Sequence, residues 1–498
     1  MTEQFVSSIN GYKVKDKSAR ESIEKLNNNI EVHAEKIENL ENASVNLGFV
    51  ASPEEYGAIG DGVADDTAAI NAALAASGAL MLKSGATYAI DGSVGVNMTS
   101  GSTLYGNGAT IKIIPSSNAN YVGVRAEGVE RCIIENVHVL GDRNEHTGTD
   151  GEWGHGIAIG NSANVVVRDC VVSECWGDGL YVSSATDAYI NNVVCDNNRR
   201  NGISMISGEN VKFVDCVCSN TNGTAPQAGI DVEPNYNTDG LKNILFERCS
   251  SVNSAGAAGI FVHTKADDSN VTFRNCHSDN KLSLLALSGQ NAKFNFEGCY
   301  IAGSSGSLLN TTFSVDSACA TFDGCTFDGL GATVGFISQT QKLQNLTVKN
   351  TKLVNLNSGR PIVWLGDRNS CNNIILDIEL INSVFTETSV PAFNANEITC
   401  FERMRTATPV ALSGTDAQPR FCEMSVSSDV SKVVATITKN IPGGVKCITN
   451  TGAVAVNVAF PTNISIGGVS ASNVANIPVG ATLFFKYGTS GKLMGWIC

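Results

Sequence analysis

The chain is poor in charge and in proline, and these shortages exclude several classes of protein. Only 16% of its 498 residues are charged, proline occurs 11 times, and acidic residues outnumber basic ones 48 to 34. A nucleic-acid-binding protein draws its affinity from a basic surface, so we expect no nucleic-acid partner. No apolar run reaches the length of about 18 residues that marks a membrane-spanning helix, so we expect no membrane insertion. The N-terminus lacks an apolar stretch behind a basic start, so we expect no signal peptide.

Apolar residues, glycine and cysteine are abundant. An apolar fraction of 43% is ample for a core and excludes a disordered chain. Glycine occurs 49 times and cysteine 16 times. One local context recurs around Cys170, Cys216, Cys249, Cys276, Cys299 and Cys325. We interpret these cysteines as small buried hydrophobic residues of a repeat rather than as disulfides or metal ligands. No CxxC pair has a matching His or Cys pair, so we predict neither a metal nor another cofactor.

The repeat behind these cysteines has a spacing of 23 to 33 residues, and Val193 completes the series. Each unit holds short runs of alternating apolar residues between Asn, Asp, Gly or Ser turns, with no helical stretch. This pattern predicts a parallel β-helix with one coil per unit and about 4.8 Å between coils. Bends that need a left-handed backbone are expected at Asp169, Asn192, Asp215, Asn275 and Asn350, and at Gly298 and Gly324.

A second strand of each coil begins directly after a glycine that recurs from coil to coil. The glycines are Gly156, Gly179, Gly202, Gly229 and Gly259. The first and third residues after each glycine are apolar and must point inward. Because side chains alternate along a strand, the second and fourth residues are expected to face solvent. Among these are Tyr181, Asp231, Glu233, Phe261 and His263.

The fold prediction is an all-β parallel β-helix with a different segment at each end. A short heptad pattern from Ile23 to Leu40 predicts a coiled coil over residues 21–47, and a solvated single helix is the alternative. From residue 401 the repeat is lost. Strands joined by GG, TG and TSG turns then predict a separate antiparallel β-sandwich over residues 401–498.

Residues 52–74 read SPEEYGAIGDGVADDTAAINAAL, where Asp65 or Asp66 caps a helix near residues 65–76 that covers the open end of the β-helix. The stretch resembles the entry motif of the pectate-lyase-like, right-handed β-helix superfamily, in which Tyr-Gly-Ala, Gly-Asp-Gly and Asp-Asp-Thr recur at this spacing. TLYGNGATIKI (103–113) is similar to the family's next segment. The resemblance implies a right-handed β-helix over residues 48–400 and says little about chemistry.

The N-terminal INGYKVKDKSARESIEKL is similar to the start of tail proteins of phages that infect Gram-positive bacteria. An attachment segment over residues 1–20, a β-helix and a C-terminal β-domain together resemble a phage tail spike or receptor-binding protein. The resemblance implies a homotrimer on the virion, made in the host cytoplasm and joined to a tail or baseplate protein through its N-terminus. It also implies a bacterial surface polysaccharide as partner, with a C-terminal domain that trimerises or binds glycan.

Two lengthened coils mark where such a ligand can bind. Their extra residues, GDRNEHTGTDGEWGH (141–155) and SNTNGTAPQA (219–228), flank the coils that carry Asp178, Asp231 and Glu233. Loops that protrude beside stacked carboxylates predict a groove for an extended ligand. The candidates for substrate binding, by stacking on sugar rings or by charge, are Trp153, His155, Tyr181, Phe261, Arg199 and Arg200.

The hypothesis for function is a glycosidase-type polysaccharide depolymerase. Asp231 and Glu233 are its predicted acid/base pair, with Asp178 assisting and His263 tuning the pair. Two positions along one strand separate Cα atoms by about 6.6 Å, and His263 occupies the Glu233 position one coil later. Glycoside hydrolysis needs a carboxylic acid and a carboxylate about 5–9.5 Å apart.

Two alternatives stay open. The carboxylates can be ordinary solvated side chains of a non-catalytic adhesin or structural tail protein that only binds glycan. The protein can also be a polysaccharide lyase with Arg199, Arg200 or Lys265 as its base, although no Ca²⁺ loop is evident. The Asn-Thr-Asp, Asp-Asp, Gly-His-Gly series of inverting polygalacturonases is not followed, because Gly154-His155-Gly156 precedes the carboxylate strands.

Overall fold

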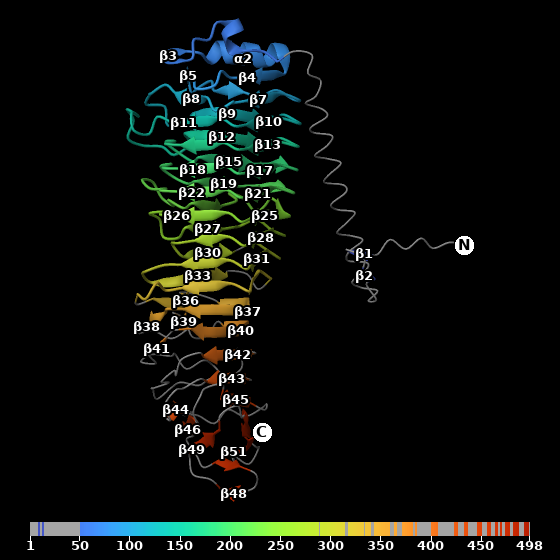
Figure 1. The fold of residues 1–498 in the computed structure, drawn as a ribbon, viewed down its shortest axis with the longest axis vertical. Coiled ribbons are helices and arrows are strands. Elements are labelled where there is room, and N and C mark those ends of the chain that lie inside the picture. Colours follow the sequence, from blue (N-terminus) through green and yellow to red (C-terminus); the bar gives the residue numbers. More distant parts are fainter. Residues whose placement is uncertain are drawn as a thin grey trace, which may run out of the picture.

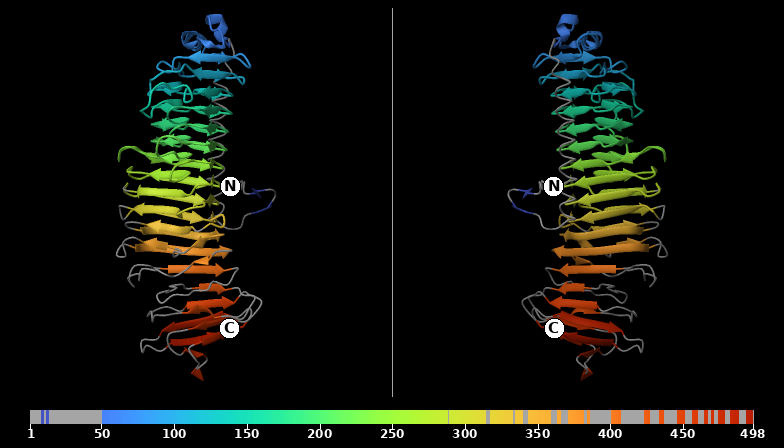
Figure 2. Two further views of the ribbon diagram at one scale, coloured as in Figure 1. Left: turned by 90° about the vertical axis from the view of Figure 1, so that its left-hand side faces the viewer. Right: turned by 90° about the vertical axis from the view of Figure 1, so that its right-hand side faces the viewer.

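A computed structural model describes residues 50–287 and 289–313, and beyond these mainly strands as far as Ile497. Before residue 50 it describes β1 (Ser8–Ile9) and β2 (Tyr12–Lys13), which pair antiparallel. The described chain from residue 50 onward winds into a tall column of stacked coils (Figure 1). Side views show the same stack of strands from end to end (Figure 2). The predicted parallel β-helix is confirmed.

Three columns of parallel strands form the three sides of the coils. The column that carries the candidate site is an 11-stranded parallel sheet of β6 (Val96–Asn97), β9 (Val122–Glu127), β12 (His155–Gly160), β15 (Leu180–Ser183), β19 (Ile203–Met205), β23 (Ile230–Val232), β27 (Ile260–His263), β30 (Leu282–Leu287), β33 (Ser307–Phe313), β36 (Gly335–Gln339) and β39 (Val363–Leu365).

The other two columns meet at the bend before the repeated cysteine. One contains β10 (Ile133–Glu135), β13 (Val166–Arg168), β17 (Tyr189–Asn191), β21 (Lys212–Val214), β25 (Ile244–Glu247), β28 (Asn270–Arg274), β31 (Lys293–Glu297) and β34 (Cys319–Asp323). The other contains β11 (His138–Leu140), β14 (Val171–Ser173), β18 (Val194–Asp196), β22 (Val217–Ser219), β26 (Ser250–Val252), β29 (His277–Ser278), β32 (Tyr300–Ala302) and β35 (Thr326–Asp328). Both columns continue into β37 (Leu343–Val354).

The register of the site column is the one that the glycine alignment predicts. Ile157 pairs with Leu180, and the next coils continue the ladder through Ile203, Ile230 and Ile260. A Cβ atom on Gly202 would lie 2.6 Å from the Gly229 carbonyl oxygen, so only glycine allows this approach between coils. The glycines therefore maintain the spacing between coils.

The predicted left-handed bends are also confirmed. Asp169, Asn192, Asp215, Asn275 and Asn350 have φ between 48° and 56°. Gly298 and Gly324 take the same conformation at φ 63° and 65°. Short polar side chains and glycine are the residues that adopt this region at least cost, which explains their recurrence at one place in each coil.

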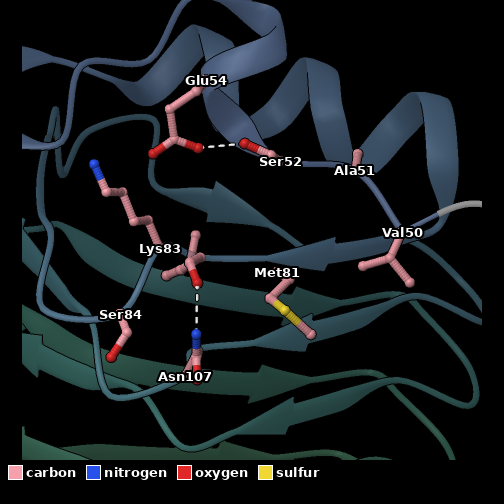
Figure 3. A pocket seen from close by; sticks show the side chains of 9 residues that line it. Val50, Ala51, Ser52, Glu54, Met81, Lys83, Ser84 and Asn107 are labelled. Atoms are coloured by element: carbon pink, nitrogen blue, oxygen red, sulfur yellow. Dashed lines mark hydrogen bonds between the residues drawn. The ribbon is translucent and has the colours of Figure 1, made fainter.

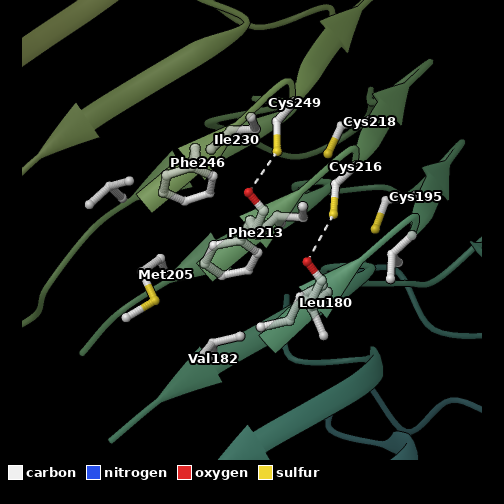
Figure 4. Close-up of a cluster of buried hydrophobic side chains, with 14 of the residues drawn as sticks. Leu180, Val182, Cys195, Met205, Phe213, Cys216, Cys218, Ile230, Phe246 and Cys249 are labelled. Carbon is white, nitrogen blue, oxygen red and sulfur yellow. Dashed lines mark hydrogen bonds between the residues drawn. The ribbon is translucent and has the colours of Figure 1, made fainter. Parts of the chain in front are cut away.

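The core is filled by columns of like side chains, because every coil repeats the same register. Five phenylalanine rings stack at 4.5 to 4.9 Å between centroids: Phe213, Phe246, Phe273, Phe296 and Phe322. Beside them, the Cys249 thiol donates to the Phe213 carbonyl oxygen at 3.4 Å, and neighbouring thiols repeat the contact (Figure 4). The cysteines thus pack as small apolar groups, and thiols such as those of Cys249 and Cys276 each lie within weak hydrogen-bond distance of two carbonyl oxygens.

The cysteine column predicts a simple labelling result. Ten of the described cysteines are buried and free, and only Cys319 is partly exposed. We expect native protein to leave the ten buried thiols unmodified by an alkylating reagent and fully denatured protein to expose all of them. Peptide mapping after each treatment checks this. Native disulfides among the residues of the column would contradict it.

The N-terminal end of the column is covered by the predicted helix. Helix α2 (Thr67–Ser77) lies over β4 (Ala79–Met81) and turns Ile70, Ala73 and Leu74 into the core (Figure 1). Asp66 stands at the N-cap position, but its carboxylate accepts from the Ile59 and Gly60 amides at 2.7 and 3.1 Å. The Asp66 side chain therefore stabilises the Gly-rich turn that precedes β3 (Asp61–Asp65) and makes no capping hydrogen bond with the helix.

A pocket of about 560 Å³ lies at this covered end, where the chain enters the column (Figure 3). Its lining includes Glu54 and Lys83, and Asn107 donates to the Leu82 carbonyl oxygen at 3.4 Å. Its lining also includes Met81 of β4, and several coils separate β4 from β15 and β19, the strands beside the candidate site (Figure 1). It therefore takes no part in the candidate site.

At the C-terminal end, parallel pairing continues past the boundary expected at residue 401. β42 (Cys400–Thr406) pairs in parallel with β40 (Cys371–Ile381) and β43 (Glu423–Val426), and β43 does so with β45 (Lys446–Asn450). Antiparallel pairing begins between β45 and β50 (Thr482–Tyr487). The sandwich stays a prediction, because much of the chain between these strands lies outside the described residues.

The predicted attachment segment (1–20) and coiled coil (21–47) also lie outside the described residues, apart from β1 and β2. Within the part of the chain that the structure describes, no helix has the length and apolar character needed to cross a membrane.

Candidate active site

The candidate site is organised around one guanidinium group. Arg200 lies in the turn before β19, and its side chain is 15% exposed. Its Nη1 lies 3.3 Å from Asp178 Oδ2, and its Nη2 donates to Glu233 Oε2 at 3.1 Å. Its Nε lies 3.3 Å from Glu152 Oε2, an ion pair without hydrogen-bond geometry. Three carboxylates from three parts of the chain thus converge on one cation.

Asp178 is the fully buried member of this cluster. It occupies the bend before β15, and its backbone N–H donates to His155 Nδ1 at 3.4 Å. His155 Nδ1 also lies 3.6 Å from Asp178 Oδ2. Burial lowers the pKa of His155 to about 3, and the charge of Arg200 adds to this effect. Because Nδ1 accepts a backbone proton and the ring is neutral, the contact with the carboxylate is no ion pair, and His155 carries its proton on Nε2.

The His155 ring stacks on Tyr181 at 4.5 Å between centroids. Tyr181 is half-buried as a result and turns one face of its ring to His155. The two residues, both predicted to bind substrate, therefore form one aromatic unit beside Asp178. Their part in substrate binding stays a prediction.

The expectation that Asp231 faces solvent is wrong. Its side chain points away from the core, yet the residue is 0% exposed. Ser204 of the preceding coil and Phe261 of the following coil pair directly with Asp231 and cover it from both sides. Asn201 Nδ2 donates to Asp231 Oδ2 at 2.8 Å, while Oδ1 has no hydrogen-bond partner among the described residues. Asp231 is therefore a support beneath the site rather than a group that solvent reaches.

Asp231 and Glu233 are driven to opposite protonation states. Burial raises the pKa of Asp231 well above its usual range, and the charge of Glu233 raises it further. The contact with His263 lowers the pKa of Glu233, and Arg200 adds to this against the effect of burial. Glu233 is 28% exposed. The pair therefore holds a proton on the buried carboxyl and a negative charge on the accessible one.

The raised pKa of Asp231 has a consequence for stability. A carboxyl that binds its proton more tightly in the folded state loses stability as pH rises from the unfolded pKa of about 3.9 towards the folded one. Asp231→Asn has no such proton to lose, and its amide can still accept from Asn201. We expect urea unfolding of Asp231→Asn to show a flatter decline between pH 5 and pH 8, and stability at pH 8 no lower than wild type. A variant that is clearly less stable at pH 8 would contradict the buried proton.

His263 occupies the position predicted for it. It ends β27 one coil after Glu233, and its Nδ1 lies 3.6 Å from Glu233 Oε1. The Phe261 ring meets the His263 ring edge to face at 6.4 Å between centroids. His263 and Arg200 therefore hold the Glu233 carboxylate from two sides.

Glu152 is a member of the site that the sequence analysis missed. It lies in the first insertion, and its side chain is 37% exposed. Trp176 packs against this insertion. The His146 ring stacks on the Trp176 ring at 3.9 Å between centroids, and the Arg199 guanidinium lies 3.9 Å from the Trp176 ring centroid. Arg199 Nη1 also donates to the Gly151 carbonyl oxygen at 2.7 Å. These contacts fix the backbone just before Glu152 and so aim its carboxylate at Arg200.

Of the remaining candidates, Arg199 belongs to this support of the loop, because its guanidinium contacts Gly151 and Trp176. Trp153 is 55% exposed beside Glu152, a position suited to stacking. The second insertion reaches the site through Ala228, whose amide donates to Asn201 Oδ1 at 3.1 Å. The groove between the insertions stays a prediction. Among the described residues, no three His, Cys, Asp or Glu side chains converge as metal ligands do.

Residues 81–247, which hold most of this site, match the family model described as "Right handed beta helix region". The match gives the hand of the β-helix and covers about a third of the chain. No sequence among curated proteins matches the chain significantly.

Solved structures with the same fold include three of different kinds. The tailspike protein of E. coli bacteriophage HK620, in complex with a pentasaccharide, has a TM-score of 0.46 and 12% identity over 88% of this chain and 84% of that one. The A-module of a mannuronan C-5 epimerase of Azotobacter vinelandii has a TM-score of 0.41 and 16% identity over 67% and 95%. PfbA, a surface adhesin of Streptococcus pneumoniae, has a TM-score of 0.40 and 11% identity over 89% and 98%. At these values the likeness concerns the fold alone.

Proposed function

We propose that this β-helix binds a polysaccharide across the face of Arg200 and hydrolyses its glycosidic bonds. The observation that carries the proposal is the pair of solvent-reachable carboxyls, Glu152 and Glu233, on one buried guanidinium. Because Glu152 Oε2 and Glu233 Oε2 contact the same group, they lie no more than about 9 Å apart, which is below the upper limit of about 9.5 Å for glycosidase carboxyl pairs. A sugar linkage that enters between them meets a carboxyl on each side.

The roles follow from the surroundings of each group. Glu233 is held ionised by His263 and Arg200, so it acts as the base that activates water or attacks the sugar. Glu152 is the accessible carboxyl on the other side of the bond. To donate a proton to the leaving oxygen, it has to leave Arg200 and bind a proton when the glycan enters. Asp231, predicted as one member of the acid/base pair, keeps its proton beneath Glu233 and positions Glu233, and Asp178 holds Arg200. Trp153 and the Tyr181–His155 unit offer surfaces for sugar rings.

The test is the release of reducing ends from polysaccharide fractions of bacterial envelopes. We expect wild-type protein to release oligosaccharides with saturated ends. Products with an unsaturated sugar, detected by their ultraviolet absorbance, would instead support the lyase alternative with an arginine or Lys265 as base. Binding without release from any fraction would support the adhesin alternative and refute the catalytic roles.

We also propose that the protein acts on a phage tail as a homotrimer, anchored to a tail or baseplate protein by residues 1–20. The similarity of the N-terminal sequence to phage tail proteins supports this proposal. Light scattering of the full chain tests it, and a stable monomer at micromolar concentration would contradict it.

A further inference from the structure

We infer that the site selects glycans whose sugars carry no acidic group, and that it binds a free amino sugar more tightly than its N-acetylated counterpart. This inference rests on the proposed function and names its substrate class. It rests on the excess of negative charge at the site and on the three carboxylates that already contact Arg200, the central cation.

Arg200 cannot serve an acidic substrate. Its Nη1, Nη2 and Nε already face Asp178, Glu233 and Glu152, respectively. The carboxylate of a uronic acid that approached this guanidinium would have to displace one of these groups and would face the remaining two. His155, which lies against Asp178, is neutral and adds no positive charge. The cluster therefore presents surplus negative charge to a ligand.

Acidic groups extend over the face beside the cluster. Burial raises the pKa of the Tyr181 phenol, and the charge of Asp178 adds to the rise. Asp239, in the loop after β23, and Glu127, at the end of β9, raise it further. Two further guanidiniums act near the cluster. Arg125, on β9, contributes to the low pKa of His155. Arg199 contacts Gly151, the residue before Glu152. Carboxylates thus outnumber guanidiniums where sugar rings would stack.

The accessible acceptors of the site are the carboxylates of Glu152 and Glu233. Asp231 is fully buried and holds its proton beneath Glu233, so it offers no acceptor to a ligand. A donor group that enters beside Arg200 therefore meets two carboxylates that solvent also reaches. An ammonium group offers three donors and a positive charge, whereas an N-acetyl group offers one donor and no charge.

Isothermal titration of the full chain with oligosaccharides in three charge classes tests the inference. The probes are glucosamine oligomers, the same oligomers after N-acetylation, and galacturonate oligomers. Each is prepared with the linkage found in the envelope fraction that the protein binds. We expect the amine form to bind about tenfold more tightly than the acetylated form, with the advantage falling as salt is raised. We expect no binding of the galacturonate form.

Glu152→Gln is the matched variant, because it removes one accessible carboxylate and keeps the side-chain shape. In this variant, the ratio of the affinity for the amine form to that for the acetylated form is expected to fall about fivefold, because one exposed charge contact is lost. Glu135→Gln, a partly exposed glutamate paired with Arg168 on another side of the column, should leave the preference unchanged. Binding of galacturonate at least as tight as that of the amine form would overturn the inference while leaving glycan binding intact. Absence of binding to every class would refute the proposed function and the inference with it.

Discussion

Glu233→Gln is expected to lower the rate of glycan cleavage by about 10²–10⁴-fold, because proton transfer by a positioned carboxylate contributes that much to such reactions. Glutamine keeps the length of the side chain and still accepts from Arg200 Nη2. The variant should therefore still bind the same oligosaccharides, with no more than the few-fold loss of affinity that the removal of one exposed charge contact predicts. Reducing-end assays of the rate, beside titration of binding, separate the two effects.

Two further variants make this result specific. Glu152→Gln should also lose most of the rate, because it removes the second accessible carboxyl. Glu135→Gln should retain it, although Glu135 is equally a partly exposed glutamate paired with an arginine. Wild-type rates in both Glu233→Gln and Glu152→Gln would show that the reaction takes place elsewhere on the column.

Arg200→Met is expected to destabilise the protein by about 3 kcal/mol or more. Removing one partner of a buried ion pair leaves the other charge uncompensated, and such losses are typically about 3–5 kcal/mol. Here the group left behind is Asp178, which is fully buried and whose pKa burial already raises. Its protonation relieves part of the cost, so the loss should be smaller at low pH than at neutral pH. Urea unfolding at both pH values measures this.

Arg168→Met is the matched control for stability. Arg168 pairs with Glu135 at 2.7 Å, but both side chains are partly exposed. Solvent screens such a pair, so its loss should change the unfolding midpoint only slightly. Equal effects of the two arginine variants would contradict the view that Arg200 is the electrostatic centre of a buried cluster.

Most of the fold was predictable because it repeats. The spacing of the cysteines and the glycine-aligned strands indicated the coils, and the structure pairs Ile157 with Leu180 in the predicted register. The left-handed bends followed from residue type, since Asp169 and its equivalents are the residues that accept this backbone. In such a repeat, the residue types that favour a local backbone conformation recur at the same place in every coil, so they also predict how the coils align.

The site was less predictable because it depends on contacts outside the repeat. Alternation indicates that the Asp231 side chain leaves the core, but not that Ser204 and Phe261 of the adjacent coils cover it. Glu152 lies in an insertion without periodicity. Its position is set by Trp176 and Arg199, which come from the next two coils. A glutamate beside Trp153 in the lengthened coil was the available signal, and only spatial proximity to Arg200 distinguishes it from other exposed acids.

We propose that glycan is bound and cut between Glu152 and Glu233. The most direct measurement is a crystal structure of Glu233→Gln with an oligosaccharide from the polysaccharide that wild-type protein degrades. We expect a glycosidic oxygen within hydrogen-bond reach of Glu152, the adjacent anomeric carbon facing residue 233, and a sugar ring against Trp153 or Tyr181. An oligosaccharide bound on another side of the column, with this cluster unaltered and in contact with solvent alone, would contradict it.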